Sequence, residues 1–295
     1  MFCTNPFTLQ TKQILRKFPQ GLQVPCGKCR NCKIHKRNEW VLRLKHELNY
    51  FDRSSFVTLT YDDYNIPSDE SLKKRDLQLF FKRLRKNSDK KIKYYACGEY
   101  GDRTKRPHYH SIIFGLGLTH DDKSVIMDSW RYCDWSVDSV KRNSFGSVTD
   151  KSIRYVAGYI DKKMWGDMEK EYYTDQGLEP VFKISSQGIG GRYALDNKDR
   201  IINDAVITVN GVAHSVPRYY LKKYGIDSDT LDKSEMIERE KKLVLEITGQ
   251  SMTKNDAYNW MEVDDVMLIE SEIKRSNMQR ALNAETLSNL KTKKL

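Results

Sequence analysis

The sequence predicts an α+β fold in which an antiparallel sheet is flanked by helices. Short stretches with alternating apolar residues are interrupted by longer stretches with helical periodicity. Two of the strand-like stretches, residues 91–99 and 109–114, are joined by the short polar loop Gly101–Arg106, which is typical of a hairpin. The resulting order, β-α-β-β-α-β-α, favours an antiparallel sheet with helices packed on it rather than a parallel sheet.

Individual elements follow from their own patterns. Residues 33–51 predict a basic amphipathic helix, because apolar residues from Trp40 to Leu48 recur at helical spacing. Residues 55–61 predict the first strand, and residues 71–86 and 121–132 predict helices. Less definite patterns indicate a further strand within 134–148, a loop or flap at 165–179, a glycine turn at 188–191, a hairpin around Asn210-Gly211 and a helical region from about 227 onward.

A His-x-His pair opens the second strand of the hairpin. His108 and His110 share one face of a strand, at roughly 6–7 Å between their bases, so both imidazoles can bind one metal ion. Glu99 ends the partner strand near His108. Two imidazoles and one carboxylate suit Mg²⁺ or Mn²⁺. The alternative is an edge strand with two exposed histidines and a solvated glutamate.

The predicted helix at 154–163 carries two tyrosines one turn apart. Ile153, Val156, Ala157, Ile160 and Met164 form one apolar stripe, and the helical period places Tyr155 and Tyr159 nearly opposite it. Lys162 and Lys163 lie close to the tyrosines along the helix. This arrangement favours two nucleophiles presented side by side, and two ordinary surface tyrosines are the alternative.

Four cysteines near the amino terminus indicate a metal site. Cys26, Cys29 and Cys32 have the spacing of a metal knuckle, and Cys3 or His35 can complete a tetrahedral zinc site. An iron–sulfur cluster and three free cysteines in a loop are the other interpretations. In each case the expected role is structural or DNA-positioning rather than catalytic.

Composition favours a polyanionic partner. The 295 residues carry a formal net charge of +11. Residues 1–50 hold 10 Lys and Arg against 2 Asp and Glu, a net of +8, whereas residues 226–295 hold 11 against 14, a net of −3. A basic surface of this kind suits nucleic acid. We expect a protein without a membrane span or signal core, because no apolar run is long enough.

Together these motifs resemble the HUH rolling-circle replication initiators, which implies a ferredoxin-like or RRM-like core. Four further motifs narrow the resemblance to replication initiators of small gokushovirus-type microviruses, and they are Phe56–Tyr61, Pro25–Cys32, Gly188–Gly190 and Pro217–Tyr220. The resemblance extends to about Lys223 and departs at Gly158, where some related initiators carry a lysine between the tyrosines.

The resemblance implies nicking and joining of single-stranded DNA at the replication origin of a circular genome. Tyr155 and Tyr159 would be nucleophiles, Lys162 or Lys163 would assist them, and Glu99, His108 and His110 would bind the divalent cation. The predicted DNA contacts are Lys36, Arg37, Lys105, Arg106 and Arg154. A host helicase is expected because the sequence has no phosphate loop, and a host DNA polymerase would extend the free 3′ end in the host bacterial cytoplasm.

The predicted domain boundaries are 1–52 for the cysteine region and basic helix, 53–166 for the endonuclease core, 167–225 for an accessory region and 226–295 for a helical end. A non-catalytic, zinc-dependent nucleic-acid-binding regulator is the main rival function. A plasmid relaxase or transposase would use the same chemistry, but the paired tyrosines and flanking motifs argue against it.

Overall fold

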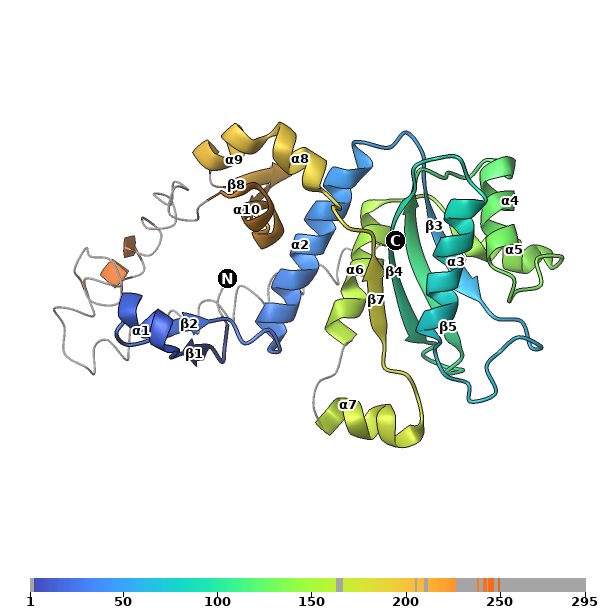
Figure 1. Ribbon diagram of the computed structural model, residues 1–295, viewed down its shortest axis with the longest axis horizontal. Helices are drawn as coiled ribbons and strands as arrows, with labels where there is room; N and C mark the ends of the chain where they lie inside the picture. Colours follow the sequence, from blue (N-terminus) through green and yellow to red (C-terminus); the bar gives the residue numbers. More distant parts are fainter. Residues whose placement is uncertain are drawn as a thin grey trace. The chain divides into compact units, whose positions relative to one another are not determined.

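The computed structural model describes residues 3–162, 167–204, 206–209 and 212–226, with residues 238, 241–242, 244–246 and 249. The chain forms two compact units, and each is described by itself. One comprises Lys36–Tyr193, and the other combines Met1–His35 with Ala194–Leu295. Figure 1 shows the sheet that forms the centre of the unit Lys36–Tyr193.

This central sheet has five strands in the order β6-β3-β5-β4-β7, and every neighbouring pair is antiparallel. The strands are β3 (Ser54–Thr60), β4 (Lys93–Tyr100), β5 (Pro107–Phe114), β6 (Phe145–Gly146) and β7 (Phe182–Ser185). The β4–β5 hairpin pairs Glu99 with His108, and the β3–β5 ladder pairs Thr58 with His110. Register therefore fixes which polar side chains meet at one end of the sheet.

Helices cover both faces of the sheet, so each face has its own apolar core (Figure 1). The helices α3 (Lys74–Lys86) and α4 (His120–Ser129) lie on one face, where the α3 residues Leu77, Phe80, Phe81 and Leu84 are buried. The other face carries α6 (Asp150–Lys162) and the part of α2 (Arg30–Leu48) that belongs to this unit. Burial of each such side chain stabilises the fold by about 1.5–3 kcal/mol. The two cores hold the strand ends and α6 in fixed positions.

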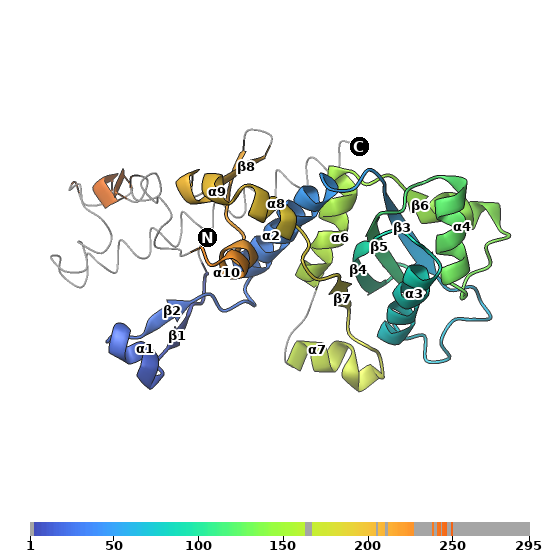
Figure 2. The ribbon, with the colours of Figure 1, turned by 45° about the horizontal axis from the view of Figure 1, so that its top comes forward.

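Connecting elements in this unit include α5 (Asp138–Ser144), α7 (Asp167–Tyr172) and the 3₁₀ helix η1 (Thr174–Gln176). The other unit begins with β1 (Phe7–Leu9), α1 (Lys12–Lys17) and β2 (Leu22–Val24), and β1 pairs with β2 (Figure 2). The helix α8 (Gly191–Asp196) spans the boundary. Beyond it lie α9 (Lys198–Asp204), the hairpin β8 (Val206–Val209) and β9 (Val212–Ser215), and α10 (Arg218–Tyr224).

The structure confirms the α+β class, the antiparallel sheet, the central hairpin and the hairpin near residue 210. Three predictions need correction. The segment 165–179 was expected as a loop but contains α7 and η1, and the segment 134–148 is mostly α5 with only the two-residue strand β6. Strand β7 was not predicted. Most of the expected helical region beyond residue 226 lies outside the described residues. None of the described helices is long and apolar enough to cross a membrane.

Candidate active site

Three predicted metal ligands meet at one end of the sheet. His108 and His110 lie on β5 with one residue between them, and Glu99 lies opposite His108 on β4. The Glu99 Oε1 atom is 3.0 Å from His108 Nε2 and 3.2 Å from His110 Nε2. Glu99 and His110 are buried, and His108 is partly exposed. The three side chains therefore form one compact group whose ligand atoms lie within 4.8 Å of one another.

The Nδ1 atom of each imidazole contacts a polar group on the side away from Glu99. His108 Nδ1 is 3.1 Å from the Arg106 carbonyl oxygen, and His110 Nδ1 is 3.0 Å from Thr58 Oγ1. The ring of Phe56 also stacks on His110, with 5.6 Å between centroids. A hydrogen bond at one ring nitrogen orients a metal-binding histidine and leaves the other nitrogen as the ligand. Sequence reasoning missed this role of Thr58, because it depends on the β3–β5 register.

The residues fit a divalent cation for a second reason. Four groups converge on Glu99 Oε1, namely both Nε2 atoms and two tyrosine hydroxyls, whereas a carboxylate oxygen has about two lone-pair sites. Because a carbonyl accepts only, His108 Nδ1 must donate to Arg106, so neutral His108 turns an unprotonated nitrogen towards the carboxylate. Two imidazole nitrogens and a carboxylate converging in this way form a donor set for a divalent cation.

Burial opposes ionisation of Glu99, but hydrogen bonds from His108, His110 and Tyr159 outweigh it and hold the pKa of this carboxyl well below its ordinary value. Glu99 is thus an anion in the folded protein. A negative ligand next to two neutral imidazoles strengthens cation binding, because it offsets the charge of the metal.

Both predicted nucleophiles reach this group from α6. Tyr155 Oη is 3.4 Å from Glu99 Oε1 and 3.3 Å from His110 Nε2, and Tyr159 Oη donates to Glu99 Oε1 at 2.5 Å. Their environments differ, since Tyr155 is 48% exposed and Tyr159 only 5%. The expectation that both tyrosines lie opposite the apolar stripe is right for Tyr155 and wrong for Tyr159, which packs in the core beneath α6.

Burial and the hydrogen bond to the Glu99 carboxylate raise the pKa of Tyr159 well above its ordinary value. Tyr159 is therefore protonated in the folded protein, and its proton is engaged by Glu99. Tyr155 has the longer contacts and the greater exposure. The two hydroxyls approach the same carboxylate oxygen but differ in access to solvent.

Comparison with known proteins decides the family. The family model described as a replication-associated protein of the ORF2 type matches residues 54–164, which include Glu99, both histidines and both tyrosines. The chain is 31% identical over 241 residues to "Replication-associated protein VP4" of Bdellovibrio phage phiMH2K, covering 75% of this chain and 73% of that protein. The chain belongs to the replication-associated proteins of small phages.

Two further relatives agree. "Replication-associated protein ORF2" of Spiroplasma virus 4 is 33% identical over 217 residues, covering 68% of this chain and 66% of the relative. "Replication-associated protein ORF4" of Chlamydia phage 1 is 28% identical over 254 residues, covering 81% and 63%. No solved structure matches the chain. The predicted resemblance to microvirus-type replication initiators is confirmed, and a role in viral genome replication follows.

In this family member the cysteine cluster is a second group of potential metal ligands. The sulfur atoms of Cys3, Cys26, Cys29 and Cys32 lie within 4.8 Å of one another, and His35 is not part of the group. Cys3 Sγ and Cys29 Sγ are 3.7 Å apart, close to the roughly 3.8 Å that tetrahedral zinc–thiolate geometry gives. The backbone N–H groups of Cys26 and Cys29 donate to Cys3 Sγ and Cys26 Sγ.

Electrostatics at one of these thiols favour a metal ligand. Burial opposes ionisation of Cys29, but hydrogen bonds from Thr4 and Cys32 lower the pKa of its thiol to about 6. Zinc binds the thiolate form, so a thiol that ionises near neutral pH costs little to deprotonate. The four cysteines therefore fit zinc.

The predicted DNA-binding residues are not all equally available. Arg106 Nη2 contacts the Tyr61 carbonyl at 3.0 Å and Asp63 at 2.7 Å, so its guanidinium is partly engaged. Lys105 is exposed in the hairpin loop with a positive φ of 55°, and Arg154 is exposed on α6. Lys36 and Arg37 lie on α2, Lys36 exposed and Arg37 partly so. The side chains of Lys162 and Lys163 lie outside the described residues.

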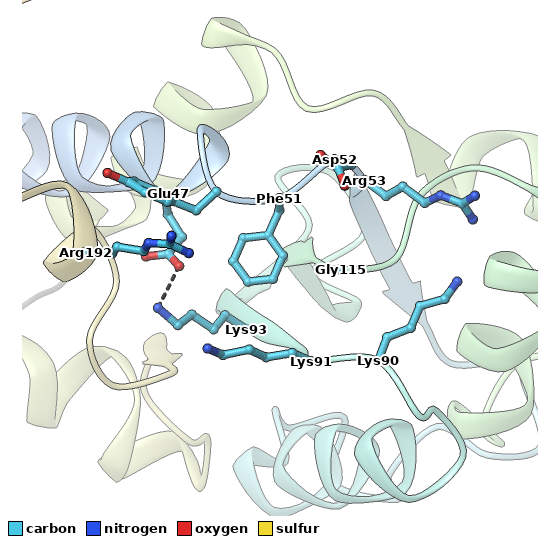
Figure 3. Close-up of a pocket in the computed structure, with 10 residues that line it drawn as sticks. Glu47, Phe51, Asp52, Arg53, Lys90, Lys91, Lys93, Gly115 and Arg192 are labelled. Carbon is cyan, nitrogen blue, oxygen red and sulfur yellow. Dashed lines mark hydrogen bonds and ion pairs between the residues drawn. The ribbon is translucent and has the colours of Figure 1, made fainter. Parts of the chain in front are cut away.

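A hollow of about 440 Å³ lies at the other end of the sheet, where β4 begins (Figure 3). It is separated from Glu99 by roughly 20 Å along the strand. Its basic residues are largely paired with buried carboxylates, since Lys93 contacts Glu47 at 2.6 Å and Lys90 contacts Asp122 at 2.6 Å. These ion pairs fix the far end of the sheet, so this hollow is distinct from the cluster of ligands and tyrosines.

Proposed function

We propose that this protein nicks and rejoins single-stranded DNA by metal-dependent transesterification, with a tyrosine as the nucleophile. One observation carries the proposal: two tyrosine hydroxyls from a single helix converge on a carboxylate that already meets two histidines. A binding protein has no need for nucleophiles placed against potential metal ligands. The family's role in phage genome replication supplies the substrate class, DNA.

The chemical step exchanges one phosphate ester for another. The tyrosine oxygen forms a bond to phosphorus, the bond from phosphorus to the 3′ oxygen breaks, and the 5′ phosphate stays on the tyrosine. The phenolic proton leaves to water at the exposed edge of the site, and the 3′ oxygen takes up a proton. Because the number of phosphate ester bonds is unchanged, rejoining needs no ATP.

Residues of this chain divide the work. Glu99, His108 and His110 would hold Mg²⁺ or Mn²⁺, and the cation would polarise the scissile phosphate as a Lewis acid. Lys162 or Lys163 would favour the phenolate form of the attacking tyrosine, whose pKa is otherwise near 10. Lys105, Arg106, Arg154, Lys36 and Arg37 would contact the DNA backbone, which gives affinity without sequence readout.

Tyr155 is the better placed first nucleophile, because a DNA strand can reach its half-exposed hydroxyl without displacing the core. Tyr159 would act in the second step. While Tyr155 holds the 5′ end, Tyr159 would cut the regenerated origin, and the released 3′ hydroxyl would close the genome. This sequence starts and ends rolling-circle replication of a single-stranded DNA genome.

Partners follow from what the chain would leave undone. The free 3′ hydroxyl would prime a host DNA polymerase, and a host helicase would separate the strands in the host bacterial cytoplasm. Zinc bound by Cys3, Cys26, Cys29 and Cys32 would stabilise the amino-terminal segment, in place of the large core that such a small segment lacks.

The test is covalent capture of origin DNA. Single strands covering the source genome are labelled at the 3′ end, incubated with protein and Mn²⁺ or with chelator, and separated under denaturing conditions. We expect a labelled protein band that requires the metal and disappears when both tyrosines are changed to Phe. An adduct that survives the double change would refute the nucleophile assignment. Binding without any adduct across the genome would favour the zinc-dependent regulator instead.

A further inference from the structure

Lys183 occupies an unusual place on the same face of the sheet as the histidines. It lies on the edge strand β7 and pairs with Cys97 on β4, which in turn pairs with His110 on β5. Lys183 and His110 therefore lie in one row across the sheet, about 10 Å apart at their backbones by the usual strand spacing. No motif in the sequence pointed to this lysine, because β7 was not predicted.

Aromatic rings surround the ammonium group of Lys183. Its Nζ atom is 3.8 Å from the centroid of Trp40 and 5.4 Å from that of Tyr95, and the guanidinium of Arg43 lies 4.0 Å from the same Trp40 ring. Cations bind aromatic faces in this way, and the attraction grows when water is excluded. The ammonium also donates to Ser185 Oγ at 3.2 Å. Lys183 is thus held in place before any ligand arrives.

The charged groups acting on Lys183 are positive. Burial and the positive charges of Arg43 and Lys36 lower the pKa of Lys183 to about 8. Within the described part of the chain, no carboxylate forms an ion pair with it. A desolvated cation among other cations is unfavourable unless an anion joins it. Lys93, on the neighbouring strand and the same face, shows the ordinary solution, since it pairs with the buried Glu47 at 2.6 Å (Figure 3).

We propose that Lys183, Arg43 and Lys36 form a binding subsite for a backbone phosphate of single-stranded DNA, beside the cleavage centre. The proposal rests on the proposed function only in taking DNA as the ligand. Lys183 Nζ points along β7 towards Ser185, away from the end of the sheet that carries Glu99. The phosphate bound here is therefore one that flanks the cut, and the subsite fixes the path of the strand.

The salt dependence of binding tests this subsite directly. Each phosphate contact on a single strand contributes about 0.7 to the slope of log affinity against log salt concentration. The probe is a fluorescein-labelled deoxythymidine oligomer in EDTA, so neither cleavage nor origin sequence affects the result. We expect Lys183→Met to reduce the slope by about 0.7, Lys36→Met to do the same, and Lys183→Arg to leave it unchanged.

A matched control removes the same charge elsewhere. Lys82 is exposed on α3, which covers the opposite face of the sheet, so Lys82→Met should leave the slope at its wild-type value. Thermal melting checks folding, and Lys183→Met should melt no lower than the wild type because no ion pair is lost. Lys36 is exposed, so its variant keeps the test decisive even if Lys183→Met folds poorly.

The outcomes separate this subsite from the cleavage reaction. An unchanged slope in Lys183→Met and Lys36→Met overturns the subsite, even if the wild type forms the metal-dependent adduct. Equal changes in Lys183→Met and Lys82→Met overturn it as well, because they would show only an effect of net charge. A reduced slope confined to the Lys183 and Lys36 variants supports the subsite, even if no adduct forms and the nickase proposal fails.

Discussion

Changing each tyrosine of α6 separately to phenylalanine should have unequal effects on the first cleavage. In Tyr155→Phe only the buried Tyr159 remains, and its hydroxyl must give up the 2.5 Å hydrogen bond to Glu99 before it can attack. In Tyr159→Phe the half-exposed Tyr155 remains, with its longer contacts of 3.3 and 3.4 Å. We therefore expect Tyr155→Phe to be slow and Tyr159→Phe to stay close to wild type.

The size of the difference follows from that hydrogen bond. A hydrogen bond to a charged group contributes about 1.5–3 kcal/mol. Because each 1.36 kcal/mol of barrier is tenfold in rate, its loss slows attack by about 10- to 150-fold. Burial of Tyr159 adds to this cost, since the core must open for the scissile phosphate, so the range is a lower bound.

A single-turnover assay measures the effect. Origin single strand labelled at the 3′ end is mixed with excess protein and Mn²⁺, quenched in denaturant at intervals, and the covalent adduct is quantified on a gel. Peptide mapping then locates the nucleotide. In the wild type it should lie on Tyr155, and in Tyr155→Phe the slow adduct should lie on Tyr159. Rapid modification of Tyr159 in the wild type would refute the argument from exposure.

Three further predictions concern the groups around the site. Thr58→Val removes the partner of His110 Nδ1, so Mn²⁺ affinity should fall about 10- to 100-fold without unfolding, as measured by calorimetric titration; unchanged affinity would contradict the orienting role. Cys26→Ser should lose one zinc per chain by elemental analysis, and retained zinc would contradict the four-cysteine site. Gly115→Ala should destabilise by more than about 1 kcal/mol in chemical unfolding, because φ is +101° and a Cβ would strike the Lys91 carbonyl. Gly158→Ala, with open space in α6, is the matched control and should be neutral or stabilising.

The central hairpin could be predicted because its information is local. The two-residue period of a strand places His108 and His110 on one face, and the short loop brings Glu99 beside them. The same locality made the cysteine group predictable, since three of its members lie within seven residues. In both cases chain connectivity alone limits where the side chains can lie.

The parts that sequence reasoning missed depend on contacts between distant segments. Tyr159 lies at the edge of the apolar stripe on a helical wheel, and only the packing of α6 on the sheet decides that it is buried. Lys183 belongs to a four-residue strand that joins β4 from far along the chain, and no face of that strand is fully buried. Without a hydrophobic alternation, such a strand has no signature in the sequence.

The convergence of both tyrosines on one carboxylate oxygen has a consequence for the reaction cycle. Tyr155 and Tyr159 are one helical turn apart, so a single rigid element presents both to the same ligands. Under the proposed mechanism, one metal site would then serve both cleavages, and any difference between them would come from access rather than from separate chemistry. We therefore expect the adducts on Tyr155 and Tyr159 to show the same order of preference among Mg²⁺, Mn²⁺ and other divalent ions, although their rates differ. A different order for the two adducts would mean that each tyrosine uses its own set of ligands, which the shared contact with Glu99 argues against.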